Sequence, residues 1–312
     1  MKRIAMLTVL GCLLLVACDQ NNTSEDAPMN SLPDINARLA FSCKHQVIPE
    51  STAETDVLFK YARWLQKNNL INRDKAVDVE IARLYRIAAE NGHYKASINL
   101  QNGALRGRFS LSSHERLRLS QQLIDANIAA GYYFIAIYLE HGAAGLAQDT
   151  EMALRYYRKA ADEGNPQAQA YVGDKLAPAD MAPDIARQMF HCAAEQGNGE
   201  AARSLGVDLK ISKQYQEALV IFQLGVAAGD ETSAAWLSDT FLGPEPGDSL
   251  DYMGQQKDTE RARRYKVIWR ILAKYSWAHP TVPEINDIVP LPPRRSLSGT
   301  ENSNGWKSGR PM

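Results

Sequence analysis

Apolar and polar residues follow a helical period from about residue 75 to residue 275, and one short phrase recurs within that pattern. Each copy places a pair of alanines before a glycine, at Gly92, Gly131, Gly164, Gly197 and Gly229. These glycines lie 39, 33, 33 and 32 residues apart, and a second helical stretch follows each of them. The pattern predicts helix-turn-helix repeats, with a glycine just past the end of each first helix, where a left-handed residue closes the C-cap.

A single repeat of this kind cannot bury its own apolar face, so neighbouring repeats must stack into a solenoid. The alanines let antiparallel helices approach closely, and Pro166 falls at the start of a second helix, where its missing N–H costs nothing. The predicted fold class is therefore all-α. It consists of an α-solenoid over residues 75–278, an N-terminal capping-helix region at 39–74 and an extended, proline-rich C-terminal tail at 279–312.

The capping region contains one amphipathic helix, predicted at residues 56–67. Val57, Tyr61, Trp64 and Leu65 share a face of it, and we expect the helix to pack on the solenoid. The basic repeat is also interrupted twice, by insertions at residues 107–113 and 243–254.

Residues 149–169, DTEMALRYYRKAADEGNPQAQ, resemble a near-ideal Sel1-like repeat, a relative of the tetratricopeptide repeat. The likeness extends over roughly residues 75–275, with looser first and fifth copies and a last copy that has only its first helix. It implies a solenoid that works by binding other proteins, through its inner helix face and its inserted loops.

The N-terminus has the composition of a targeting segment. Lys2 and Arg3 precede an uncharged apolar run that ends at Ala17 and is shorter than the roughly 20 residues of a membrane-spanning helix. Leu15-Val16-Ala17-Cys18 resembles the bacterial lipobox, which implies cleavage of a signal peptide at 1–17 and acylation of Cys18. Two or more acyl chains anchor a protein stably, so we expect a membrane-anchored lipoprotein that faces the periplasm.

A polar stretch follows the acylation site and suggests how the anchor is joined to the body. Residues 18–38 contain Pro28 and Pro33 and predict a flexible tether. Asp19 resembles the signal that keeps such lipoproteins in the inner membrane. This favours the inner membrane over the outer, and the choice between them stays open.

Charge and cysteine content narrow the function further. Loss of the signal peptide changes the net charge from −1 to −3, which does not suggest nucleic-acid binding. Cleavage removes Cys12 and acylation uses Cys18, so Cys43 and Cys192 remain in an oxidising compartment. They form either a disulfide or two buried thiols.

The sequence contains no motif that predicts catalysis. A P-loop, a dinucleotide-binding G-x-G-x-x-G, an H-E-x-x-H and a G-x-S-x-G elbow are all missing. Cys43-x-His45 supplies two ligands where a structural zinc needs four. Glu90, Glu163 and Glu195 recur at one repeat position, which indicates a turn or capping role. We therefore predict no catalytic residue, cofactor or metal, and a protein that is not an enzyme.

A second resemblance concerns the whole chain. A lipobox, a polar tether, a Phe-x-Cys-x-His start, Sel1-like repeats and the ending INDIVPLPP at 285–293 are together similar to Sel1-repeat lipoproteins encoded beside type VI secretion phospholipase effectors. The resemblance implies an immunity protein that captures a phospholipase toxin. Aromatic side chains flanked by charges are typical hot spots of binding, so the expected partner contacts are Tyr132, Tyr133, Trp236, Asp248, Asp251 and Tyr252.

A scaffold and an enzyme are the two alternatives to an immunity protein. A Sel1-repeat scaffold of an envelope complex would use the same surface and needs no toxin. An enzyme such as a peptidoglycan hydrolase would need paired carboxylates in a separate domain, and the chain has no spare domain for them.

Overall fold

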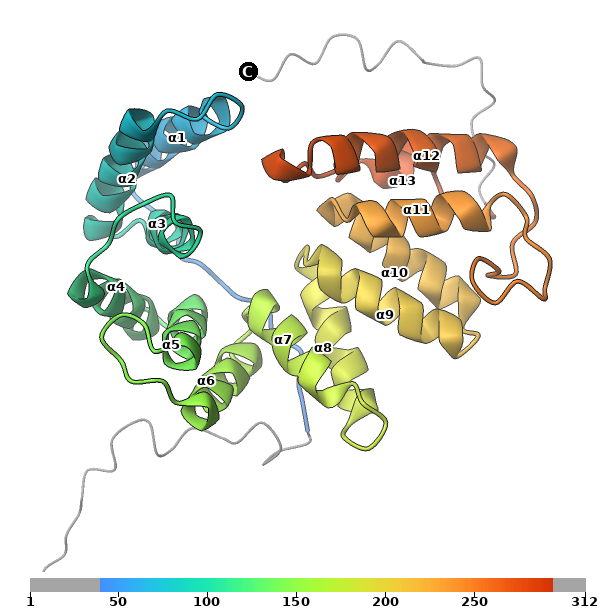
Figure 1. Cartoon of the computed structure of the whole chain (residues 1–312), viewed down its shortest axis with the longest axis horizontal. Coiled ribbons are helices and arrows are strands. Elements are labelled where there is room, and N and C mark those ends of the chain that lie inside the picture. The colour runs from blue at the N-terminus through green and yellow to red at the C-terminus, as the bar shows by residue number, and fades with distance from the viewer. Residues whose placement is uncertain (1–39, 294–312) are drawn as a thin grey trace, which may run out of the picture. The chain divides into compact units, whose positions relative to one another are not determined.

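The computed structural model describes residues 40–293, which form helices joined by short turns and contain no strand (Figure 1). The predicted signal peptide at 1–17, the expected acylation site Cys18, the predicted tether at 18–38 and the end of the tail at 294–312 lie outside the described residues. The helices are α1 (Ala53–Asn68), α2 (Lys75–Glu90), α3 (Tyr94–Leu105), α4 (Ser113–Asp125), α5 (Ala130–His141), α6 (Thr150–Asp162), α7 (Pro166–Leu176), α8 (Pro183–Glu195), α9 (Gly199–Ile211), α10 (Tyr215–Ala228), α11 (Glu231–Thr240), α12 (Thr259–Lys274) and α13 (Ile285–Ile288), with a 3-10 turn at Ser276–Ala278.

Consecutive helices pack in pairs, as expected for stacked helix-turn-helix repeats. The pairs are α2 with α3, α4 with α5, α6 with α7, α8 with α9, and α10 with α11; α1 packs on α2, and α12 packs on α11. Four of the predicted glycines close the first helix of a pair in the left-handed region: Gly92, Gly164, Gly197 and Gly229 have φ values of +82°, +99°, +83° and +93°. The all-α solenoid predicted from the sequence is confirmed.

The second repeat closes differently from the prediction. Asn127 takes the left-handed position after α4, with φ +57°, because an asparagine tolerates this conformation better than most residues. Gly131 lies instead in the first turn of α5, where α4 approaches it closely: a Cβ there would sit 2.6 Å from the Ser120 carbonyl oxygen. The Ala129-Ala130-Gly131 phrase therefore starts a helix and does not end one, and its assignment as a C-cap was wrong.

Helix α1 is present, but it buries a different face from the one predicted. Val57, Tyr61 and Trp64 are 66%, 50% and 51% exposed, whereas the core side of the helix consists of Ala62 together with Leu58, Phe59 and Leu65. Of the four residues predicted to share a face, only Leu65 packs on the core, and Ala62 on that side is fully buried.

The C-terminal tail differs in one detail from the extended segment that was predicted. Residues 285–288 form the short helix α13, which packs against α10. Six residues separate Pro283 from Pro290, and this leaves room for one helical turn between residues that cannot continue a helix. The insertion after α3 also contributes to the core, because Phe109 and Leu111 are buried.

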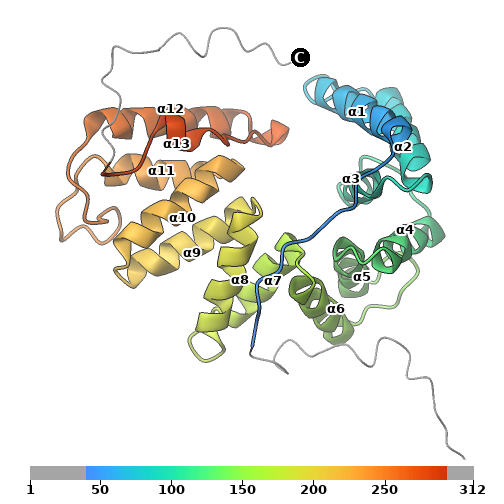
Figure 2. The same ribbon diagram turned by 180° about the vertical axis from the view of Figure 1, so that it is seen from behind.

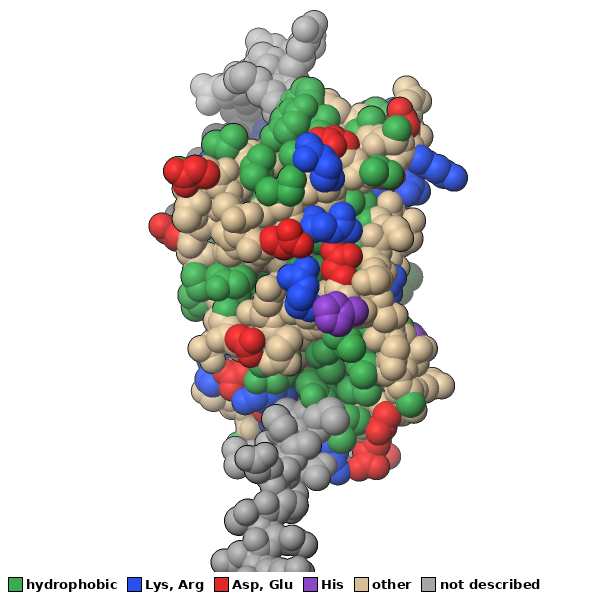
Figure 3. Space-filling view, turned by 90° about the vertical axis from the view of Figure 1, so that its left-hand side faces the viewer, with side chains coloured by type: hydrophobic (Ala, Val, Ile, Leu, Met, Phe, Trp, Pro, Cys, Tyr) green, Lys and Arg blue, Asp and Glu red, His purple; other side chains and the backbone are tan. Residues whose placement is uncertain are grey.

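The surface is mixed in charge on the side formed by the N-terminal helices. Lysine, arginine, aspartate and glutamate side chains alternate there with small apolar groups, and no extended patch of one sign is visible (Figure 3). Within residues 40–293, no helix has both the length and the apolarity that crossing a bilayer requires.

Candidate functional site: the binding surfaces of the solenoid

Residues 40–51, here called the N-terminal segment, have no regular secondary structure and cross several repeats before α1 begins (Figure 2). Arg158 of α6 donates a hydrogen bond to the Ala40 carbonyl oxygen at 3.0 Å, and Gln169 of α7 donates one to the Lys44 carbonyl oxygen at 2.9 Å. The segment thus acquires its backbone partners from helices more than 100 residues away in the sequence.

Gln46 joins three consecutive repeats. Its side-chain oxygen accepts hydrogen bonds from the Ala130 N–H at 2.7 Å and from the Asn165 side-chain amide at 3.3 Å, and its backbone N–H donates to the Gln196 side chain at 2.9 Å. The three partners lie at the start of α5, the N-cap of α7 and the C-cap of α8. The side chain and backbone N–H of one glutamine therefore connect three turns of the solenoid.

Two of the recurring glutamates hold the same segment. Glu163 pairs with Lys44 at 3.5 Å, and Glu195 lies 3.3 Å from the His45 ring. Hydrogen bonding to Lys159, with a smaller contribution from Lys44, keeps the pKa of Glu163 below its ordinary value. The turn or capping role expected for the recurring glutamates stays a prediction; the structure pairs the Glu163 and Glu195 side chains with the N-terminal segment.

Gly164 is required by that contact as well as by its own conformation. A Cβ at this position would lie 2.8 Å from the Gln46 nitrogen and 2.8 Å from the His45 carbonyl carbon. The turn between α6 and α7 therefore provides a flat surface on which the segment lies.

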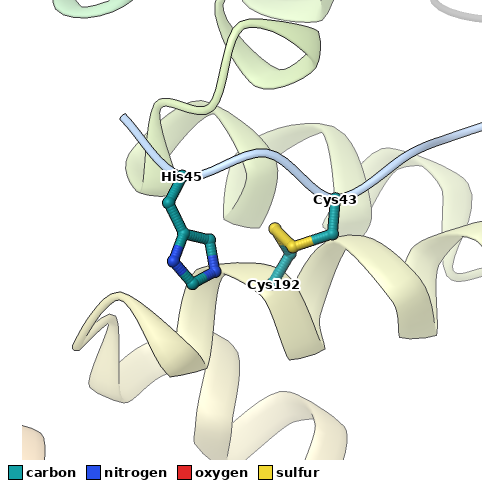
Figure 4. A group of neighbouring side chains, drawn as sticks. All are labelled: Cys43, His45 and Cys192. Atoms are coloured by element: carbon teal, nitrogen blue, oxygen red, sulfur yellow. A yellow bond between two sulfur atoms is a disulfide. The ribbon is translucent and has the colours of Figure 1, made fainter. Parts of the chain in front are cut away.

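A disulfide between Cys43 and Cys192 links the segment to α8 across 149 residues of sequence, with a Cα–Cα distance of 5.6 Å. Of the two alternatives that the sequence left open, the structure contains the bridge. His45 lies beside it (Figure 4).

An open groove of about 720 Å³ runs next to the disulfide, between the N-terminal segment and helices α8 to α10. Its lining is mainly apolar. The apolar residues include Phe41, Leu205, Leu209, Val220 and Ile221, and the polar residues include Arg187, His191, Glu195 and Glu217. A mainly apolar groove with a few polar groups is typical of a site that receives side chains of another molecule.

Tyr132 and Tyr133 lie on α5 within a cluster of aromatic residues. Tyr133 packs edge-on against Tyr157, and Tyr157 stacks on Tyr171 with ring centroids 3.9 Å apart. Glu140 accepts hydrogen bonds from the Tyr157 and Tyr171 hydroxyls at 2.6 and 2.7 Å. Burial and these bonds to a carboxylate raise the pKa of both tyrosines. The two predicted contact residues are half-buried and border this cluster.

Trp236 and the predicted loop form a second cluster around Lys210. The Lys210 ammonium lies 4.1 Å from the centre of the Trp236 ring and donates hydrogen bonds to the carbonyl oxygens of Ser249 and Leu250. Asp248 accepts from the backbone N–H groups of residues 250 and 251, which shapes the loop from within. The structure therefore brings Trp236, Asp248 and Asp251 together around Lys210, packs Tyr252 of the same loop edge-on against Tyr215, and places Tyr132 and Tyr133 on a different repeat.

The sequence analysis missed the groove and the bridging role of Gln46. Glutamine is common on protein surfaces, and nothing in its neighbourhood marks it as a residue with three partners. The Cys43-x-His45 pair was the one signal that could have indicated these contacts. A disulfide from Cys43 to α8 also places the residues next to Cys43, including Gln46, against the repeats.

The described residues form a repeat solenoid with an apolar groove and two aromatic clusters. Repeat solenoids are a class of protein that presents extended surfaces for binding other proteins. The Sel1 repeat family model matches residues 82–93, 129–165 and 166–198, so the chain contains Sel1 repeats. A second family model, a domain of unknown function (DUF6396), matches residues 233–307. Comparison with curated proteins gave no match.

Three solved structures are similar along most of the chain. Pseudomonas aeruginosa 5086 (PA5086) is 28% identical, with a TM-score of 0.59 over 81% of this chain and 95% of that one. Immunity protein PA5088 from Pseudomonas aeruginosa is 25% identical, with a TM-score of 0.62 over 81% and 94%. Immunity protein Pa5087 from the same organism is 24% identical, with a TM-score of 0.61 over 81% and 95%, a likeness that shows the fold.

Proposed function

We propose that this chain is an immunity protein that binds and neutralises a toxic effector protein. The observation that carries the proposal is the likeness to immunity protein PA5088, which extends over almost the whole of that protein and includes the region outside the Sel1 matches. The groove and the aromatic clusters support it, because they offer apolar and aromatic anchors with polar surroundings.

The finer part of the proposal concerns the effector and the place of action. We propose a type VI secretion phospholipase as the partner and a lipid-anchored position facing the periplasm. A lipase must bring an apolar mouth to the membrane, and a tethered binding protein could cover that mouth. Attachment at Cys18 would raise the effective concentration of the inhibitor at the membrane that is attacked.

Co-expression tests the proposal. Cells that direct the cognate phospholipase to the periplasm are expected to lose viability, and the chain is expected to restore it. Purified protein should inhibit phospholipid hydrolysis at a one-to-one ratio. Full toxicity in the presence of folded chain contradicts the proposal.

A scaffold of an envelope complex is the second candidate, supported by the Sel1 repeats themselves. Affinity capture with residues 19–312 distinguishes the two. An immunity protein recovers an effector that carries phospholipase activity, whereas a scaffold recovers a stable set of envelope proteins, and deletion of its gene alone causes an envelope defect.

A further inference from the structure

Two pairs of metal-ligand side chains, distant in sequence, face one another where the N-terminal segment crosses α8. Cys43 and His45 are two residues apart on an extended stretch, which places them on the same side. Cys192 and Glu195 are three residues apart on a helix, which also places them on one face. The ligand atoms of Cys43, His45 and Cys192 all lie within 4.8 Å of one another (Figure 4), and Glu195 Oε2 is 3.3 Å from His45 Nε2.

We propose that reduction of the Cys43–Cys192 disulfide turns this cluster into a binding site for a thiophilic divalent cation such as Zn²⁺. Two thiolates, an imidazole and a carboxylate form a four-ligand set of the type that zinc accepts. Tetrahedral zinc keeps its sulfur and nitrogen ligands roughly 3.3–3.8 Å apart. Cys43, His45 and Cys192 already form a mutually close group, and Glu195, which contacts His45, joins it by a rotation of its side chain toward the ion.

The redox step balances with a dithiol of the thiol–disulfide oxidoreductase class. The dithiol gives two electrons and two protons, its own sulfurs become a disulfide, and the Cys43–Cys192 bond breaks to yield two thiols. The cation then binds both sulfurs as thiolates and releases the two protons to solvent. In the oxidised protein the sulfurs are bonded to each other, so they are not thiolate ligands.

Both reactants can reach the site. Cys43 is exposed, and the His45 side chain is 51% exposed. His191 also contacts Glu195, at 3.5 Å, and so holds the far side of the carboxylate. A bound cation would keep residues 43–45 on α8 when the disulfide is open, so the segment stays attached to the repeats in either redox state.

Titration of the full chain with Co²⁺ and then Zn²⁺ tests the inference, which is independent of the proposed function. The protein reduced by a phosphine should bind one Co²⁺ and show intense thiolate-to-metal absorption in the near ultraviolet, and Zn²⁺ should abolish it. The oxidised protein should show neither. Equal binding by the reduced and oxidised proteins overturns the inference.

Variants show which side chains bind the ion. His45→Ala is expected to weaken Zn²⁺ binding by the reduced chain more than about 100-fold, beyond the roughly 10- to 100-fold effect of removing an outer partner. His114→Ala, at an exposed histidine on α4, is the matched control and should change nothing. Equal affinities for these two variants contradict the proposed ligand set.

Circular dichroism of the reduced protein, recorded with and without Zn²⁺, separates ion binding from a loss of structure on reduction. The ion should raise the unfolding temperature, or restore the helices, in the wild type and in His114→Ala but not in His45→Ala. No change in any of the three overturns the inference.

Discussion

Two non-helical stretches depart from the repeat architecture, and the structure holds them in different ways. The N-terminal segment is joined to α5, α6, α7 and α8 by hydrogen bonds, an ion pair and a disulfide. The loop at residues 243–258, here called the C-terminal loop, is attached through Lys210 and Thr240 of the neighbouring helices, and residues 245–250 are exposed. The segment therefore contributes to stability across repeats, whereas the loop buries Met253 and leaves the side chains of residues 245–250 available to a partner.

The disulfide gives the largest test of this difference. Replacing both Cys43 and Cys192 by serine is expected to lower the free energy of unfolding by about 2–5 kcal/mol, since a long closed loop constrains the unfolded chain. Denaturant unfolding of the oxidised wild type and the double variant measures the loss. Mass spectrometry of the unreduced protein provides the control, and two free thiols in the wild type would remove the premise.

Gly164 tests the same segment without touching the bridge. Gly164→Ala adds left-handed strain and a Cβ that meets the segment, whereas Gly92→Ala adds comparable strain, at φ +82°, with nothing within 4 Å. Left-handed strain costs about 1–3 kcal/mol in a residue other than glycine. We expect Gly164→Ala to cost clearly more than Gly92→Ala in thermal unfolding. Equal losses of stability in the two variants would show that the N-terminal segment moves away from the added Cβ at no cost.

These contacts also show how far the sequence could lead. The repeats were predictable because alanine pairs, turn glycines and cap residues obey local rules that act within one repeat. Gln46 was not, because its three partners lie 84, 119 and 150 residues away and only the stacked repeats bring them together. The exposed side of α1 was misjudged for a related reason: the face that a helix buries depends on its packing against the next helix, here α2, and not on its own sequence alone.

The candidate binding surfaces also differ in how far apart their residues lie in the sequence. Trp236 and the C-terminal loop were both named from the sequence as partner contacts, and the structure joins them through Lys210, which contacts the Trp236 ring and the loop backbone. The groove beside Phe41 could not be read from the sequence, because its walls come from the N-terminal segment and from three helices about 150 residues later.

Glu140 lies outside both the N-terminal segment and the C-terminal loop, and its replacement should change stability by an intermediate amount. Burial opposes its ionisation, but hydrogen bonds from Tyr157 and Tyr171 prevail, and the pKa of Glu140 lies below the ordinary value of 4.5. A lowered pKa in the folded state means that the ionised group stabilises the fold above about pH 4.5 and loses this effect as the pH falls. Glu140→Gln should cost about 1 kcal/mol at neutral pH. The gap between wild type and variant should close in acid, and a gap that stays constant with pH would contradict the assignment.

The C-terminal loop should show the smallest change in stability and a separate change in binding. Asp251→Asn removes a charge from a half-buried loop residue whose hydrogen bond from Thr240 uses its backbone carbonyl, so the free energy of unfolding should change by less than about 0.5 kcal/mol. If the loop contacts the effector, the same variant weakens inhibition of the cognate phospholipase. Asp180→Asn, in the exposed turn after α7, is the matched control and should leave both properties unchanged. A loop variant that alters stability but not inhibition would place the loop with the N-terminal segment as a structural element, and the binding surface would then be sought at the groove.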